Sequence, residues 1–225
     1  MSRKKPDSSD NPGLPTGDAA PNAPDVWSDR TFTDYSFDGA DFTRLRRLHR
    51  CVFERCRFVR ADLTEIATDA CEFHDCDFTD ARFNASTHHS SAFVNGTFRG
   101  ASLFLATFRA CKFIGSDFSE AEAGALTVEG GDWSWTNFRG LDLSKTQFEG
   151  VKLVEADFFG ADLSGASLRG CDLARATLTK ATFFEADLRG ASLEGVALQD
   201  VNLRKTRIDI PLAITFAQAH GLIVE

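Results

Sequence analysis

The sequence predicts an all-β solenoid, a rod of stacked coils closed at its C-terminal end by one helix. Three observations predict it. An apolar residue recurs every five positions, a small residue often lies two positions before it, and the pattern stops at residue 208, where a helix start signal follows. A period of five fits neither the 3.6 residues per turn of a helix nor the alternation of a plain strand. It fits a backbone that turns a corner every five residues, so that four sides complete one coil.

Residues 1–26 precede the repeat and are rich in Pro, Asp, Ser, Asn and Gly, without apolar periodicity. Such a composition buries too little apolar surface to fold, so we expect a disordered tail. Its basic start lacks the apolar segment of a signal peptide. The chain also has no run of about 18 apolar residues, the length needed to span a membrane. We therefore expect a cytoplasmic protein without a membrane contact.

The repeat occupies residues 27–208, and its phase is unbroken from Leu48 to Ile208. Upstream, residues 27–42 keep the five-residue step but lie one residue out of phase. One extra residue within 43–47 therefore predicts a bulge or bend. The chain has 21 Phe but only one Tyr and one Met, which indicates one core pocket repeated many times.

The large and the small residue of each repeat are both predicted to point inward, stacked on their copies one coil away at about 4.8 Å. A large side chain beside a small one fills a narrow interior without voids. Burial of each Leu or Phe contributes roughly 1.5–3 kcal/mol. The residue between the two is often Asp or Asn, which we expect to hydrogen-bond the backbone at the corner. Nine or so coils predict a rod of roughly 43 Å.

The six cysteines and a polar interruption both have structural interpretations. Every Cys occupies the small inward position, so we expect buried apolar side chains and neither disulfides nor zinc ligands. These residues are Cys51, Cys56, Cys71, Cys76, Cys111 and Cys171. His88 replaces a central Phe, and Thr68 falls on the same side of the neighbouring coil. We expect a hydrogen-bonded polar pair there rather than a site, and we predict no metal and no cofactor.

Residues 209–225 change character and predict a helix that covers the open end of the rod, since solenoids need caps. Asp209 is a suitable N-cap, and Pro211 falls in the first turn. Apolar residues at helical spacing, followed by a short apolar tail, also predict a two-fold dimer contact. The residues expected to form it are Leu212, Phe216, Ala219, Leu222 and Ile223.

The formal net charge of −8 argues against direct binding to nucleic acid and favours a basic partner. The candidate partner-binding acids are Asp62, Glu65, Asp69, Glu72, Asp75, Asp77, Asp80, Asp117, Glu120, Glu122, Asp142 and Asp162. The first seven form a girdle around one coil, within a stretch that has no Lys or Arg. Glu122, Asp142 and Asp162 are predicted to stack on one side, where either a basic partner or simple recurrence of the repeat's Asp explains them. On the side centred on Phe58, charges alternate in sign, which indicates ion pairs between coils.

The sequence contains no Gly-rich phosphate loop, no nucleophile elbow and no zinc-ligand spacing. A rod filled by its own side chains also leaves no ligand pocket. We therefore predict that the protein is not an enzyme and has no catalytic or metal-binding residues. It should act by presenting its surface to a partner.

The small residue, the Asp and the large residue of each repeat give the pattern A-D-L-x-x. Coils with this pattern resemble the pentapeptide-repeat family, whose members fold as right-handed quadrilateral β-helices. Three stretches are similar to its mycobacterial fluoroquinolone-resistance (MfpA-type) members: RLRRLHRCVFERCRF (44–58), STHHSSAFVNGTFRGASLFLATF (86–108) and RIDIPLAITFAQAHGLIVE (207–225). The resemblance covers about residues 27–225. It implies a homodimeric DNA mimic that binds DNA gyrase or topoisomerase IV, inhibits supercoiling and confers resistance to fluoroquinolones or topoisomerase toxins. The unbroken phase leaves no room for the projecting loops of the related Qnr proteins.

An alternative function remains open at this stage. Many proteins of this kind are interaction scaffolds, so a generic protein–protein scaffold with a non-topoisomerase partner also fits the repeat. The C-terminal stretch favours the first function because it lies outside the repeat. The alternating charges on the Phe58 side favour the second.

Overall fold

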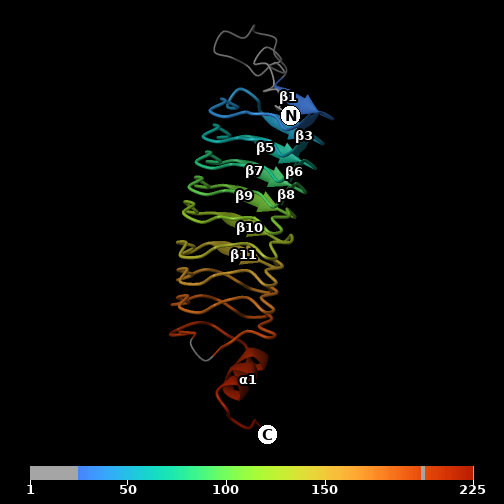
Figure 1. Ribbon diagram of the computed structural model, residues 1–225. Helices are drawn as coiled ribbons and strands as arrows, with labels where there is room; N and C mark the ends of the chain where they lie inside the picture. The colour runs from blue at the N-terminus through green and yellow to red at the C-terminus, as the bar shows by residue number, and fades with distance from the viewer. Residues whose placement is uncertain (1–24, 199–200, 225) are drawn as a thin grey trace, which may run out of the picture.

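The computed structural model describes residues 25–198 and 201–224. In these residues the backbone forms a rod of stacked coils, with one helix at the C-terminal end (Figure 1). The first strand begins at Val26, one residue before the predicted start of the repeat. The predicted tail lies outside the described residues except for positions 25 and 26. In the described residues, no helix has both the length and the apolar character required to cross a membrane.

Two parallel sheets run along the rod, and each of their strands is three residues long with a buried central residue. The larger sheet contains β1 (Val26–Ser28), β3 (Arg47–His49), β5 (Ala67–Asp69), β7 (Thr87–His89), β9 (Thr107–Arg109), β10 (Thr127–Glu129) and β11 (Gln147–Glu149). The smaller contains β2 (Thr31–Thr33), β4 (Val52–Glu54), β6 (Glu72–His74) and β8 (Ala92–Val94). The remaining coils are joined by isolated parallel bridges.

One coil uses twenty residues, because each residue pairs with the residue twenty positions later, as Ala67 does with Thr87. With an inward residue every five positions, the rod has four faces. We number them 1 to 4 by the inward residues Leu48, Phe53, Phe58 and Leu63. Face 1 carries the larger sheet and face 2 the smaller. On face 1 the pairings run through residues 26, 47, 67, 87, 107, 127, 147, 167, 187 and 207.

A residue with left-handed φ lies two positions after the inward central residue at almost every described corner, as Arg60 does with φ of 57°. A non-glycine residue there costs about 1–2 kcal/mol. The small residue that follows closes the turn, since the Ala61 N–H donates to the Phe58 carbonyl at 3.0 Å. The predicted role of the repeat's Asp is confirmed: Asp77 Oδ1 accepts the Thr79 N–H at 3.0 Å.

The predicted bulge lies at Arg46 and Arg47. Both of their N–H groups donate to the Asp25 carbonyl, at 2.7 and 3.2 Å. Two residues therefore oppose one, which is the signature of a β-bulge. As a result Val26 pairs with Arg47, twenty-one positions away, and the step is twenty from there on.

The core consists of ladders of aromatic rings in the N-terminal coils. The Phe53 and Phe73 rings stack at 4.7 Å between centroids with 2° between planes, and Phe73 and Phe93 repeat this at 4.6 Å. Offset stacking of this kind is a favourable aromatic geometry. All six cysteines, each among the described residues, are buried free thiols. Burial raises the pKa of Cys111 and Cys171 to about 11. Both the inward small position and the apolar role of Cys are confirmed.

His88 is fully buried and continues an aromatic ladder, since its ring stacks on Phe108 at 4.5 Å. Its Nδ1 lies 2.8 Å from Thr68 Oγ1, and its Nε2 lies 2.9 Å from Ser86 Oγ. Burial lowers the pKa of His88 to about 3. The imidazole is therefore neutral at physiological pH, and the predicted hydrogen-bonded pair is confirmed.

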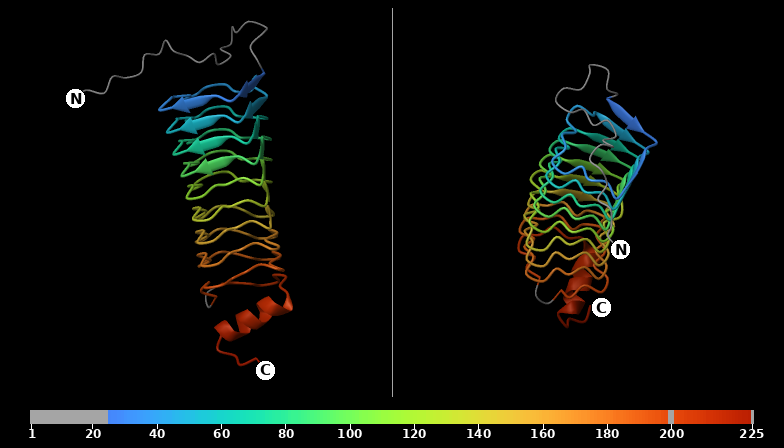
Figure 2. Two further views of the ribbon diagram at one scale, coloured as in Figure 1. Left: turned by 90° about the vertical axis from the view of Figure 1, so that its right-hand side faces the viewer. Right: turned by 45° about the horizontal axis from the view of Figure 1, so that its top comes forward.

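The helix α1 (Ile210–Ala219) lies across the end of the rod (Figure 2). One oxygen of Asp209 accepts the Leu212 N–H at 3.1 Å, as an N-cap does. The other accepts the Gly190 N–H at 2.6 Å and ties the helix to the last coils. Leu212 is buried, and Phe216 and Ala219 pack against the same core. The predicted capping role is confirmed.

Candidate functional site

The acids of the predicted girdle lie on all four faces of one coil. Asp62 and Glu65 lie on face 4. The others are Asp69 on face 1, Glu72 and Asp75 on face 2, and Asp77 and Asp80 on face 3. The structure therefore does not bring these acids together on one surface.

Most carboxylates of the girdle already have side-chain partners. Asp62 Oδ2 lies 2.6 Å from Arg82 Nη2. Asp69 lies between His49 and His89, at 3.0 and 3.1 Å from their Nδ1 atoms, and the hydrogen bond from His89 holds the pKa of Asp69 below its usual value. The remaining contacts are Glu72–His74, Asp75–Asn95 and Asp77–Thr79. Among these partners only Arg82 is a permanent cation, so the contacts fix the orientation of the carboxylates, and the girdle fails as one acidic surface because its acids lie on four faces.

Face 3 shows the ion pairs between coils that its alternating charges predict. They are Arg57–Asp38 at 2.9 Å, Arg99–Glu120 at 2.6 Å and Arg139–Asp157 at 2.9 Å. Asp117 instead accepts a hydrogen bond from Asn137 Nδ2 at 2.8 Å. These exposed pairs contribute little to stability. They do neutralise the face, so Asp117 and Glu120 do not form a free acidic surface.

Glu122, Asp142 and Asp162 lie on face 4 and form what we call the acidic column. Asp142 and Asp162 are joined by a parallel bridge, and Glu122 and Asp142 line one hollow. All three are exposed, and among the described residues none of them contacts a Lys, Arg or His side chain. Asp142 Oδ1 accepts the Ser144 N–H at 2.9 Å, and hydrogen bonding from Ser144 lowers the pKa of Asp142. Asp142 is therefore charged at neutral pH.

The acidic column departs from the pattern of the rest of the rod. Elsewhere an acid commonly meets a cation one coil away, as in Asp62–Arg82, Glu129–Arg109, Asp132–Lys152, Glu155–Arg175 and Glu185–Lys205. Strands lie about 4.8 Å apart, and like charges placed opposite each other are destabilising. The column thus keeps a like-charge repulsion with no cation beside it, whereas Glu129, which lies opposite Glu149 on face 1, is paired with Arg109.

The repeat pattern places Phe104 and Leu105 among its few outward apolar residues, but it did not predict the hollow that lies beside them. Phe104 and Leu105 lie on face 4 with 52% and 51% of their surface exposed. A hollow of about 250 Å³ lies in the next coils, lined by Ala121, Glu122, Ala123, Gly124, Asp142 and Ser144. The available signal was two consecutive outward apolar residues, followed twenty positions later by Gly124 and Ala125.

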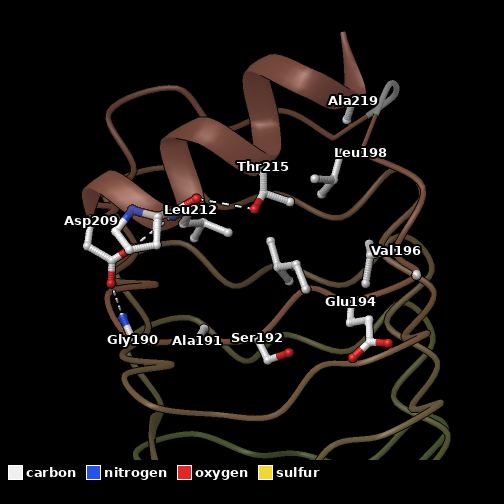
Figure 3. Close-up of a pocket in the computed structure, with 13 residues that line it drawn as sticks. Gly190, Ala191, Ser192, Glu194, Val196, Leu198, Asp209, Leu212, Thr215 and Ala219 are labelled. Atoms are coloured by element: carbon white, nitrogen blue, oxygen red, sulfur yellow. Dashed lines mark hydrogen bonds between the residues drawn. The ribbon is translucent and has the colours of Figure 1, made fainter. Parts of the chain in front are cut away.

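The predicted dimer residues fall into two groups at the C-terminal end. Leu212, Phe216 and Ala219 face the rod, and a groove of about 620 Å³ lies between α1 and the last coils (Figure 3). Leu212 is only 4% exposed, so its contact is within the chain and its predicted direct role in a dimer does not fit this position. Leu222 and Ile223 are 62% and 88% exposed and are accessible to a second copy.

Comparison with known proteins gives a family match and a shared fold. The family model described as pentapeptide repeats matches residues 156–195 and 183–209, in eight copies. A trypsin-treated variant of QnrB1, a plasmid-mediated fluoroquinolone resistance protein, superposes with a TM-score of 0.65 at 23% identity, covering 89% of this chain and all of its own. Full-length QnrB1 gives 0.53 at 22% identity, covering 85% and 100%. Comparison with curated protein sequences gives no match.

Proposed function

Because residues 156–209 match the pentapeptide-repeat family, we propose that this chain acts as a DNA mimic that binds DNA gyrase or topoisomerase IV through face 4. The fold shared with QnrB1 supports a rod of suitable shape. The observation that carries the proposal is the acidic column, which holds exposed carboxylates in line without internal cations. Residues one coil apart lie about 4.8 Å apart, so the column holds its carboxylates in a regular row, as a DNA strand holds its phosphates.

The proposed mechanism is competition for a basic surface. A topoisomerase binds the duplex through Lys and Arg side chains, and a row of carboxylates can meet the same cations. Occupation of that surface excludes DNA, so supercoiling is inhibited. It also removes the DNA on which a fluoroquinolone or toxin acts, which gives resistance. This function places the protein in the cytoplasm, with the topoisomerase and DNA.

We also propose a homodimer formed through the exposed tail, with Leu222 and Ile223 at its centre. A two-fold contact at the capped end joins two rods and doubles the length of the acidic face. Phe216 and Ala219 support this contact from the helix. Leu212 acts indirectly, by holding α1 on the rod.

The test is a supercoiling assay with purified DNA gyrase and topoisomerase IV, titrated with the full-length protein, with and without a fluoroquinolone. We expect inhibition at micromolar or lower concentration that weakens as salt is added, because electrostatic binding is screened. Less drug-induced DNA cleavage would support the protective role. Absence of inhibition of both enzymes at high concentration contradicts the proposal.

The second candidate is an interaction scaffold with a non-topoisomerase partner, and one observation favours it. Trp135, at a corner between faces 2 and 3, is 54% exposed, and its Nε1–H donates to Glu155 at 3.1 Å. Trp is enriched at interface hot spots. Pull-downs with Trp135→Ala as the comparison distinguish this surface from face 4.

A further inference from the structure

The ring of Phe104 has no cation over it among the described residues, unlike the outward rings of Phe159 and Phe184. The Phe159 ring is covered by Arg139 and Lys180, at 4.4 and 5.1 Å from its centroid. The Phe184 ring, on the same face as Phe104, is covered by a lysine at 4.9 Å. No such cation lies over Phe104 in the described part of the chain. The pair therefore presents an apolar surface that the fold does not use.

Leu105 also occupies a strained backbone position. Its φ is 59°, in the left-handed region that favours glycine. Most other non-glycine residues at such corners are charged, polar or Ala. A large side chain that is half exposed gains little for the fold at this position. Strain retained without a structural gain points to function.

The hollow next to the pair results from one missing side chain. A Cβ placed on Gly124 would lie 3.4 Å from Cδ2 of Phe104, so that ring leans over the glycine. The φ of Gly124 lies outside the left-handed region, so its backbone does not require glycine. The matching positions of two other coils hold Phe104 and Phe184, so this position of the repeat accepts a large side chain. Glu122 and Asp142 form the acidic side of the hollow.

We propose that Phe104, Leu105 and the hollow anchor an apolar side chain carried on a Lys- or Arg-rich segment of a partner protein. Charge complementarity selects that occupant, because the acidic column lines the hollow and no cation within the described chain neutralises it. The apolar pair supplies desolvated contact area, and the carboxylates around it bind the flanking cations. The identity of the partner as a topoisomerase rests on the proposed function, whereas the chemistry of the anchor does not.

The test uses two variants of the full-length protein and one control. Leu105→Gly removes the side chain and relieves the left-handed strain, so we expect its Tm to equal or exceed that of the wild type. Gly124→Phe fills the hollow at a position of the repeat where Phe occurs naturally. Phe184→Ala is the control, because it removes an outward Phe from the same face that a lysine already covers. Binding is measured by fluorescence anisotropy to purified DNA gyrase, and to two Arg-rich peptides that differ by a central Leu or Ala.

We expect Leu105→Gly and Gly124→Phe each to weaken gyrase binding by about tenfold, the effect of losing one hot spot, and Phe184→Ala to change it by less than about twofold. If gyrase binds and both variants bind as the wild type does, the anchor is refuted and the proposed function stands. If gyrase does not bind the wild type, the proposed function fails, and binding of the two peptides then tests the anchor. A preference for the Leu peptide that Leu105→Gly abolishes then supports the anchor, and equal binding of both peptides refutes it.

Discussion

Asp142 and Asp162 lie one directly above the other on face 4, joined by a parallel backbone bridge, and neither carboxylate contacts a cation among the described residues. Each uses one oxygen to accept a serine N–H of its own turn, at 2.9 Å. The turns explain why Asp occurs at this position of the repeat. They do not explain why the next coil repeats the charge without a cation beside it, since Glu129, which also lies opposite an acid one coil away, is paired with Arg109.

The acidic column can be neutralised without disturbing the turns. Asn retains the oxygen that accepts the serine N–H, so the variant Glu122→Gln, Asp142→Asn, Asp162→Asn removes three charges and keeps the corners. We expect the concentration for half-maximal inhibition of gyrase supercoiling to rise at least about tenfold. The control Glu120→Gln, Glu129→Gln, Glu155→Gln removes three charges that already have Arg partners. Equal loss in both variants would show that only net charge matters. Reversal of the column to Lys should abolish inhibition.

The repulsion within the column should be measurable as stability. We expect Asp142→Asn with Asp162→Asn to raise the free energy of unfolding by about 0.2–1 kcal/mol, the scale of a cross-strand pair. Added salt should narrow the difference, because screening relieves the same repulsion in the wild type. Urea unfolding at two salt concentrations measures both effects. Asp62→Asn, which removes a carboxylate paired with Arg82, should give no increase, and an increase there would contradict this explanation.

His88 should make the fold sensitive to acid. Its pKa is about 3 in the folded rod and 6.5 unfolded, so between these values only the unfolded chain binds the proton. Stability is then fully present above pH 6.5 and falls by about 2 kcal/mol at pH 5. His88→Phe should flatten this part of the pH profile of urea unfolding. The substitution leaves Thr68 bonded to Ser91 at 2.9 Å and Ser86 to a carbonyl at 2.6 Å. An unchanged profile would show that His88 is not responsible.

Two adjacent glycines should respond differently to alanine. A Cβ on Gly131 would lie 2.0 Å from the Cys111 carbonyl oxygen, whereas one on Gly130 meets nothing within 4 Å. Both have positive φ, so Gly130→Ala should cost about 1 kcal/mol from strain alone. Gly131→Ala must also displace backbone, and we expect it to cost more than about 3 kcal/mol. Thermal and urea unfolding check the order, and similar values for the two would contradict the close approach.

Variants of the C-terminal segment should separate its capping role from its role in dimerisation. Leu222→Asp with Ile223→Asp should give monomers with an unchanged Tm, because both side chains are exposed. Leu212→Ala should lower stability by about 2–5 kcal/mol, as for other buried leucines. Truncation after Ile208 should give monomers and should also lower stability. Light scattering after size-exclusion chromatography gives the mass, and a dimer that persists after truncation would refute the C-terminal interface.

Much of the fold could be predicted because every coil of a solenoid repeats the same local sequence pattern. The five-residue step set which residues point inward, and Cys51 and Cys171 are buried for the same reason as the alanines that share their position. One extra residue before Leu48 was enough to predict the bulge. The N-cap at Asp209 was likewise a local signal, since its carboxylate bonds an N–H three residues away.

The candidate site could be predicted only in part, because it depends on which neighbours lie one coil away. The stack of Glu122, Asp142 and Asp162 followed from counting by twenty. The contacts of Asp69 with two histidines and the ion pair of Glu120 with Arg99 depend on side-chain rotamers, which periodicity does not specify. The same holds for the division of the C-terminal residues between cap and exposed tail.

The sequence by itself thus determined the rod, its four faces, its core and its capped end, since each follows from short-range pattern and burial. Only the tertiary structure decided which acids are free, where Phe104 meets a hollow and which apolar residues remain exposed. The physical reason is distance. Charge pairing and surface shape arise between side chains twenty residues apart in the chain, and their geometry exists only when the coils are stacked.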